Sequence, residues 1–311
     1  MSTWVGFDIG GQSLKAALVD DSGRLVRHAA RPTGRQITLD DLTASLDALV
    51  TELGHDRRRA IGVGVAGCVT LDGVIRGSPN LPALAGAVIE RDLGRALGAR
   101  VIVDNDAHCH ALAEAWIGVA ASTPTFLLIT LGSGIGSGLM IDGRVYRGTT
   151  GYGCELGHMI FRPDGRICGC GNRGCLEAYL SEVALEGRVA EERPALGGRV
   201  QDLATSRGIG HAHALFELAD VGGDADAERF ANLLADDLGT ALGSAVNLFD
   251  VELIVIGGGI APGFLARAER LRRAMGQALF AREVSTVRIV PAAAGALAGA
   301  VGAARLAMRA V

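Results

Sequence analysis

Four potential metal ligands lie close together near the middle of the chain. Three thiols follow one another at C-x-C-x4-C spacing, Cys168, Cys170 and Cys175, and the first of them lies ten residues after His158. Three sulfurs and one imidazole nitrogen form the donor set of a closed tetrahedral Zn²⁺ site, which has no position open for water. The pattern therefore predicts a structural zinc. Disulfides are the alternative, but tightly spaced cysteines in a reducing compartment bind metal more often than they pair.

Two carboxylates flank these ligands. Glu155 precedes His158 by three residues, and Glu177 follows Cys175 by two. A metal that fixes this loop would also fix the position of both carboxylates. The remaining cysteines are scattered, and we expect them to be small core residues: Cys68, Cys109 and Cys154.

Two glycine turns are candidates for phosphate binding. Asp8 ends an apolar segment just before Gly10 and Gly11, and a second turn contains the run 132–134, Gly-Ser-Gly. A desolvated carboxylate needs a compensating metal, amide or ligand, and glycines let backbone N–H groups approach an anion closely. The duplicated pair indicates that the turns hold a polyphosphate. Neither turn is a P-loop, because the Gly-Lys-Ser/Thr ending is absent.

Asp106 is the candidate for acid–base chemistry. It lies where a short strand ends in Asp104-Asn105-Asp106 and a helix begins, so a plain helix cap explains it as well as a catalytic role does. A carboxylate can accept a hydroxyl proton as the oxygen attacks phosphorus, which contributes a factor on the order of 10²–10⁴ in rate. Spacing alone leaves both interpretations open.

Three further features are ambiguous on their own. The run Gly257-Gly258-Gly259 follows a strand and is either a nucleotide-contact turn or a tight connection. Lys15 follows the first glycine turn, where it is either a phosphate contact or a solvated strand residue. Asn80, in a Pro-rich loop, is an unassigned amide.

The surrounding elements alternate between strands and helices, which predicts an α/β fold with mixed sheets. The pattern of strand, glycine turn and strand over 5–20 returns over 126–145, and this internal repeat indicates two similarly built domains facing each other across a cleft. We expect a smaller N-terminal domain of residues 1–115, completed by a C-terminal helix over 292–311, and a larger domain of 116–291 carrying the zinc loop. Helices are also expected at 39–53, 84–97, 107–116, 225–248 and 264–280, and strands at 61–65, 101–103, 253–256 and 287–290.

Length and charge exclude several classes of function. The 311 residues are 49% hydrophobic, which is enough for two cores, and the formal net charge is −4. No basic block exceeds Arg57-Arg58-Arg59, so nucleic-acid binding is not expected. The apolar stretches are too short to cross a membrane, and the chain opens without a signal-peptide pattern. We therefore expect a cytoplasmic protein.

Taken in order, these motifs resemble the ROK family (repressors, open reading frames, sugar kinases) over nearly the whole chain. The segment from Glu155 to Glu177 is similar to the family signature whose His and three Cys hold zinc. The turns after Asp8 and around Ser133 resemble its two phosphate motifs, and Asn105-Asp106 resembles its catalytic motif. The glycine triplet at 257–259 matches its adenosine-side turn.

The resemblance implies a two-domain actin-like, ribonuclease-H-like fold and an ATP-dependent sugar kinase, a homodimer by family habit. Asp106 would take the proton from a sugar hydroxyl as the γ-phosphoryl group of Mg-ATP arrives. The implied substrate-binding residues are Gly67, Asn80, Asn105, Asp106, Glu155, His158 and Glu177, and the implied nucleotide-binding residues are Asp8, Gly10, Gly11, Gln12, Lys15, Gly132, Ser133, Gly134, Gly257, Gly258 and Gly259.

Three positions depart from the family pattern. Gln12 replaces the usual threonine of the first phosphate motif, Cys68 replaces a frequent proline, and Leu84 or a neighbour replaces an aromatic residue. These changes bear on rate and substrate choice. Glucose is the expected acceptor, with N-acetylglucosamine, N-acetylmannosamine, fructose and allose as alternatives. A sugar-sensing regulator and a degenerate kinase are the non-enzymatic alternatives.

Overall fold

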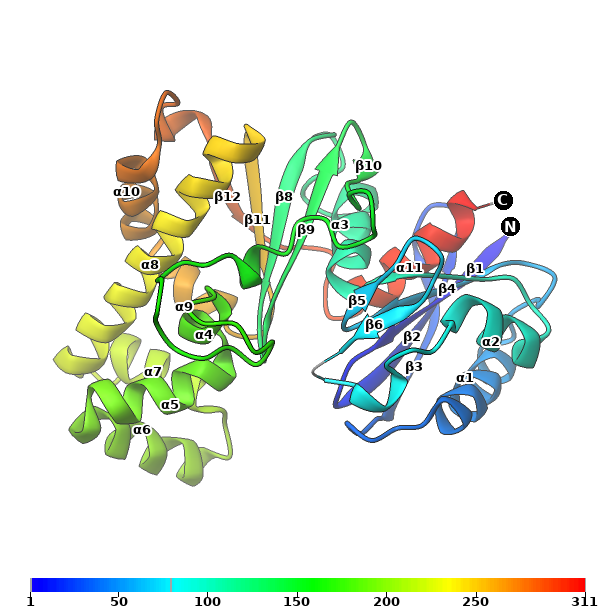
Figure 1. The fold of residues 1–311 in the computed structure, drawn as a ribbon, viewed down its shortest axis with the longest axis horizontal. Coiled ribbons are helices and arrows are strands. Elements are labelled where there is room, and N and C mark those ends of the chain that lie inside the picture. Colours follow the sequence, from blue (N-terminus) through cyan, green and yellow to red (C-terminus); the bar gives the residue numbers. More distant parts are fainter. Residues whose placement is uncertain (1, 79, 311) are drawn as a thin grey trace. The chain divides into compact units, whose positions relative to one another are not determined.

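The computed structural model describes residues 2–78 and 80–310, and these form two five-stranded sheets with the same strand order. The first sheet runs β3-β2-β1-β4-β7 and the second β10-β9-β8-β11-β12 (Figure 1). The strands of the first sheet are β1 (Thr3–Ile9), β2 (Ser13–Asp20), β3 (Leu25–Pro32), β4 (Ile61–Val65) and β7 (Val101–Asn105). Those of the second are β8 (Phe126–Leu131), β9 (Ile135–Ile141), β10 (Arg144–Val145), β11 (Leu253–Gly257) and β12 (Arg288–Pro291). The predicted α/β class and internal repeat are confirmed.

The helices connect these strands and cover them. In chain order they are α1 (Leu39–Leu53), α2 (Ile89–Leu97), α3 (Asp106–Trp116), α4 (Glu177–Leu180), α5 (Glu182–Glu192), α6 (Pro194–Arg207), α7 (His211–Asp220), α8 (Ala225–Phe249), α9 (Ala261–Leu265), α10 (Ala268–Ala278) and α11 (Ala298–Arg309). A small hairpin pairs β5 (Cys68–Val69) with β6 (Ile75–Gly77). No described helix is long and apolar enough to span a bilayer.

The chain divides into two compact units. Unit 1 comprises residues 1–128, 138–154 and 292–311, and unit 2 comprises 129–137 and 155–291. The predicted domains of 1–115 with 292–311 and of 116–291 remain a proposal, since contacts assign residues 116–128 and 138–154 to unit 1. Each unit is described below by itself.

In unit 1 the first sheet is covered on both faces. Alternate residues of β1, such as Phe7 and Ile9, join the core beneath α1 and α2. The intervening residues face α11, which packs on β1, β4 and α3 (Figure 1). A Cβ on Gly6 would lie 2.0 Å from the backbone oxygen of Ala300, so only glycine admits this close approach. The same alternation places Asp8, two residues after Gly6, on the face covered by α3 and α11.

Three predicted helices have different bounds. The last begins at Ala298 rather than residue 292, because Gly295 adopts φ +82° and the N–H groups of Ala293 and Ala294 donate to Glu114. The helix predicted over 84–97 begins at Ile89, and the one predicted over 264–280 is two helices, α9 and α10.

Candidate active site

The first glycine turn joins β1 to β2 in unit 1. The Gly10 N–H donates to Ser13 O at 3.0 Å, and the Thr33 hydroxyl donates to Gly10 O at 2.6 Å. A Cβ on Gly11 would lie 3.0 Å from the backbone oxygen of Asn80, so the turn passes directly against that residue. Gln12 is exposed at the tip of the turn. A predicted phosphate turn and a predicted sugar-binding amide are therefore neighbours.

The start of α3 carries the candidate base. Asn105 is the N-cap residue, and its Oδ1 accepts from the N–H groups of Ala107 at 2.8 Å and His108 at 3.2 Å. Its Nδ2 donates to Gly67 O at 3.1 Å, which brings two predicted sugar-binding residues together. Because Asn105 serves as the N-cap, Asp106 is not needed in that role, although its half-buried carboxylate keeps one local hydrogen bond, from the Ala107 N–H to Oδ1 at 2.9 Å. This favours the acid–base interpretation over the plain cap.

The carboxylates of Asp8 and Asp106 influence each other. Burial raises the pKa of Asp8 to about 6, although the charge of Lys15 lowers it. Burial also raises the pKa of Asp106, and the negative charge of Asp8 raises it further. The Lys15 ammonium group donates to Ala296 O at 3.2 Å in the segment before α11. Two carboxylates with raised pKa values on one face are typical of a functional site.

A buried ion cluster lies beneath the start of α3. Asp104 Oδ1 is 2.8 Å from His108 Nδ1, and Asp104 Oδ2 is 2.5 Å from the Arg147 guanidinium. Burial would raise the pKa of Asp104, but its hydrogen bond and charge interactions with His108 and Arg147 lower it overall. Burial likewise opposes protonation of His108, but Asp104 raises the net pKa of its imidazole. The cluster ties the strand before Asp106 to the segment that leads towards Glu155.

The second glycine turn joins β8 to β9. Gly132 O accepts from the N–H of Glu182, at the start of α5, at 2.8 Å. A Cβ on Gly258 would lie 2.2 Å from Leu131 O, and Gly258 adopts φ +96°, so glycine is required there on two counts. The predicted adenosine-side run, residues 257–259, therefore packs directly against the predicted phosphate turn. Ser133 is exposed at its tip.

Glu177, the first residue of α4, lies against this turn. Its Oε2 accepts from the Ile135 N–H at 2.8 Å, and a Cβ on Gly134 would lie 2.7 Å from the same oxygen. Its Oε1 is 3.5 Å from the Cys168 thiol. Glu155 directly precedes a 3-10 turn, Leu156–His158, whose first N–H donates to Ser137 on β9. Both predicted carboxylates therefore lie beside β9.

The four predicted metal ligands converge. The ligand atoms of His158, Cys168, Cys170 and Cys175 all lie within 4.8 Å of one another. The Sγ atoms of Cys170 and Cys175 are 3.7 Å apart, and Cys168 Sγ is 3.8 Å from His158 Nδ1. Metal–sulfur and metal–nitrogen bonds of about 2.3 and 2.0 Å imply tetrahedral edges of roughly 3.5–3.8 Å, so this donor set fits zinc. Burial raises the pKa of the Cys168 and Cys175 thiols, a cost that a bound cation would offset.

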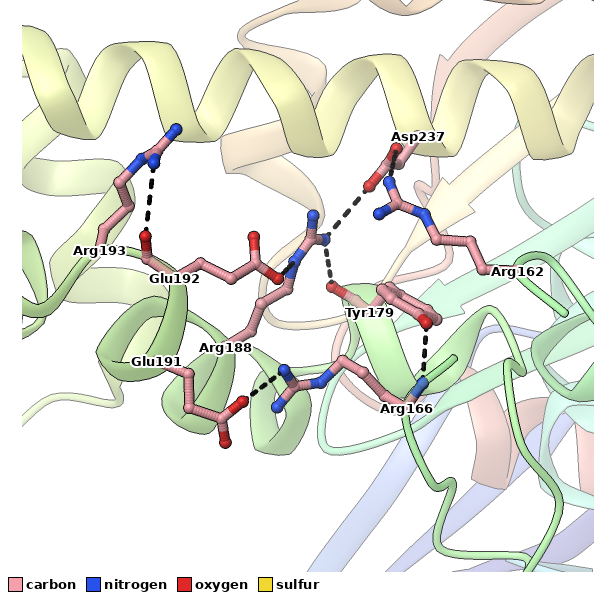
Figure 2. A network of polar contacts seen from close by, with 8 residues as sticks. All are labelled: Arg162, Arg166, Tyr179, Arg188, Glu191, Glu192, Arg193 and Asp237. Carbon is pink, nitrogen blue, oxygen red and sulfur yellow. Dashed lines mark hydrogen bonds and ion pairs between the residues drawn. The ribbon is translucent and has the colours of Figure 1, made fainter. Parts of the chain in front are cut away.

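The zinc loop, residues 158–175 with the four proposed ligands, is anchored to the rest of unit 2 through Tyr179 (Figure 2). The Tyr179 hydroxyl accepts from the Arg166 N–H at 2.8 Å, and its backbone oxygen accepts from the fully buried Arg188 at 3.1 Å. Arg162 stacks on the Tyr179 ring and pairs with Asp237 of α8 at 2.7 Å. Arg188 pairs with the other oxygen of Asp237 at 3.2 Å. Arg162 and Arg166 precede the three cysteines, and Tyr179 follows Glu177 by two residues. The network therefore fixes the zinc loop on both sides of the cysteines and close to Glu177.

The structure brings the predicted residues together as two sets, one in each unit. Unit 1 holds Asp8, Gly10, Gly11, Gln12, Lys15, Gly67, Asn80, Asn105 and Asp106, and unit 2 holds Gly132, Ser133, Gly134, Glu155, His158, Glu177, Gly257, Gly258, Gly259 and the three cysteines. Sequence reasoning did not single out His108 and His110. Their spacing could have revealed them, because both lie on the predicted helix and each follows a carboxylate, Asp104 or Asp106, by four residues across the start of that helix.

Comparisons of the sequence and of the structure with known proteins agree with one another. The sequence profile of the ROK family matches residues 4–310. A glucokinase of Thermotoga maritima is 32% identical over 82% of this chain and 81% of its own length. An N-acetyl-D-glucosamine kinase of Yersinia enterocolitica is 31% identical over 83% of this chain and 84% of its own. The crystal structure of a ROK family glucokinase from Streptomyces griseus, in complex with glucose and AMPPNP, is 30% identical with a TM-score of 0.83, over 99% of this chain and 100% of that one.

Proposed function

The chain belongs to the ROK family, and as a sugar kinase of that family we propose that it transfers the γ-phosphoryl group of Mg-ATP to a hexose, with Asp106 as general base. Its fold is the two-domain actin-like ATPase fold of the ROK glucokinases. The observation that carries the assignment of the base is local. Asn105 is the N-cap of α3, so the Asp106 carboxylate, whose Oδ1 also accepts from the Ala107 N–H, is not required as the cap, and it lies close enough to Asp8 for that charge to raise its pKa.

The mechanism assigns a role to each set of residues. Asp106 accepts the proton of the attacking hydroxyl, while Asn105, Asn80 and the backbone at Gly67 bind neighbouring hydroxyl groups. Glu155, His158 and Glu177 bind others. The two glycine turns offer backbone N–H groups to the phosphates, and the run 257–259 contacts the adenosine side. Phosphoryl transfer depends chiefly on positioning and charge stabilisation, which backbone turns and fixed carboxylates supply.

We infer that the Cys₃His cluster holds a structural Zn²⁺. Two observations support this inference. The four ligand atoms converge, and three thiol sulfurs with one imidazole nitrogen are donors that Zn²⁺ prefers. When bound, the ion supplies a rigid cross-link rather than chemistry, because four protein ligands leave no open position. The link would hold Glu177 at a constant distance from the second turn.

Glucose is the proposed acceptor. Two of the relatives carry the name glucokinase, and one of these is crystallised with glucose. An N-acetyl-D-glucosamine kinase is similar to a comparable degree, so N-acetylhexosamines are the main competing substrates, followed by fructose. A homodimer in the cytoplasm remains our prediction.

A panel of sugars tests the proposal. ADP release from Mg-ATP is measured with glucose, mannose, fructose, allose, glucosamine, N-acetylglucosamine and N-acetylmannosamine. We expect kcat/KM of roughly 10⁴ M⁻¹s⁻¹ or more for glucose, in the ordinary enzymatic range, and at least tenfold less for the N-acetyl sugars. A preference for an N-acetyl sugar would reassign the substrate. No turnover with any sugar, together with sequence-specific DNA binding, would support the regulator instead.

A further inference from the structure

His110 lies one helical turn beyond Asp106 on α3. Side chains four residues apart share a helix face, so the imidazole and the carboxylate are neighbours. A Cβ on Gly299 of α11 would lie 2.6 Å from Asp8 Oδ2 and 3.0 Å from His110 Nε2. The half-buried ring therefore lies beside Asp8 and on the face of α3 that carries Asp106. Only a glycine at position 299 leaves room for both groups.

Four charged groups surround this imidazole. Asp106 and Glu114 are on its own helix, Asp8 is on β1 and Lys15 on β2, and the α11 residue beside the ring is the uncharged Gly299. Burial lowers the pKa of His110 and Lys15 lowers it further, while the two carboxylates of α3 act in the opposite direction. The net pKa is lowered from its ordinary value of 6.5. The ring is therefore neutral at pH 7 and keeps a nitrogen able to accept a proton.

Asp106 needs such an acceptor. Burial and the charge of Asp8 raise its pKa, so a proton taken from substrate is retained more strongly than by an exposed carboxylate. Each turnover must nevertheless return Asp106 to the carboxylate form. Asp8 also has a raised pKa and lies nearby, but a proton exchanged between the two carboxylates would stay on this pair. A neutral imidazole offers the proton a separate exit.

We propose that His110 is a proton relay for Asp106, an inference that rests on the proposed kinase function. The sugar O–H bond breaks as its oxygen bonds to phosphorus and the bond from phosphorus to the ADP oxygen breaks. The proton passes to the Asp106 carboxylate and then to the His110 imidazole, which becomes an imidazolium and releases it to water. Asp106 is again a carboxylate, and the step consumes no further reactant.

Kinetics of His110→Gln test the relay, with His28→Gln, an exposed histidine of β3, as the matched control. We expect kcat to fall by about tenfold or more with little change in the KM for sugar. The acid limb of the kcat profile should move to higher pH, because His110 lowers the pKa of Asp106. Added imidazole should restore part of the activity of His110→Ala. Wild-type kcat and an unchanged pH profile in His110→Gln would overturn the relay.

A titration of the histidine resonances by NMR provides a second test that does not need activity. In Asp106→Asn the pKa of His110 should fall, since the lost carboxylate raises it. An unchanged pKa of His110 would show that the two side chains do not interact and would overturn the relay. If the wild type phosphorylates no sugar, both the proposed function and the relay fail. If it is active and His110→Gln matches it, the relay alone fails.

Discussion

Glu177 accepts a hydrogen bond from the Ile135 N–H at 2.8 Å through Oε2, while its Oε1 lies 3.5 Å from the Cys168 thiol. One carboxylate therefore joins the second glycine turn to the proposed zinc cluster. A hydrogen bond to a charged group contributes about 1.5–3 kcal/mol when desolvated, which is enough to fix the turn. Disturbing the cluster should therefore affect the phosphate turn as well as the sugar residues.

Metal analysis tests the cluster. Protein purified without added zinc should contain about one Zn²⁺ per chain, because a closed site binds its metal during folding. Cys170→Ser should lose most of the metal, lower the melting temperature and raise the KM for sugar. Cys68→Ser, outside the cluster, serves as the control and should keep the metal. Full activity in wild-type protein that contains no metal would contradict a structural zinc.

Gly134→Ala tests the link between Glu177 and the turn. Its Cβ would lie 2.7 Å from Glu177 Oε2, so the carboxylate must move and the hydrogen bond to Ile135 must weaken. We expect the KM values for ATP and sugar both to rise several-fold in steady-state kinetics. At Gly132 the added methyl group would meet no protein atom within 4 Å, so Gly132→Ala reports only contact with the nucleotide. Equal effects of the two substitutions would show that Glu177 does not act through the turn.

The Asp104–His108 pair predicts a pH dependence of stability. Because Asp104 raises the folded-state pKa of His108 above 6.5, the pair stabilises the fold fully below that pH. The contribution is lost as pH rises through the folded-state pKa, and it amounts to roughly 1.4 kcal/mol for each pKa unit of difference. The free energy of unfolding in urea, measured at pH 6 and pH 9, should fall more for wild type than for His108→Gln. A constant difference between the two proteins would contradict the ion pair, and His28→Gln provides the baseline.

Gln12→Thr tests the departure in the first turn. Gln12 is exposed at the tip, where its amide can still donate a hydrogen bond, although a hydroxyl is the family's usual donor. We predict that threonine lowers the KM for ATP by a few-fold and leaves the KM for sugar unchanged. Unaltered nucleotide affinity and rate would show that this side chain does not contact the phosphates.

Local patterns predicted much of this chain, because the decisive signals are short in range. The bounds of α1 and β4 follow directly from hydrophobic periodicity and from the Gly54 that ends the helix. The cysteine spacing likewise predicted the convergence of the metal ligands. The late start of α11 could not be predicted, because it depends on N–H groups bound by Glu114, some 180 residues earlier in sequence.

Two hydrogen bonds within the site could not be predicted, for the same reason. The hydrogen bonds of Asn105 to Gly67 and of Glu177 to Ile135 join residues about forty positions apart, and no local pattern carries that information. The environment of Asp8 was only partly predictable. The cost of burying its carboxylate was expected, but the position of His110 beside it depends on how α3 and α11 pack. Hydrophobic periodicity predicted α3 and α11 but not the contact between them.

Turnover of Asp106→Asn is the most direct test of the account. With saturating Mg-ATP and glucose, kcat should fall by at least about 100-fold, while the Kd for glucose from calorimetry stays within a few-fold of wild type. Asp202→Asn, an exposed aspartate of α6, is the matched control and should behave as wild type. Wild-type turnover in Asp106→Asn would remove this carboxylate from the mechanism and contradict the central claim.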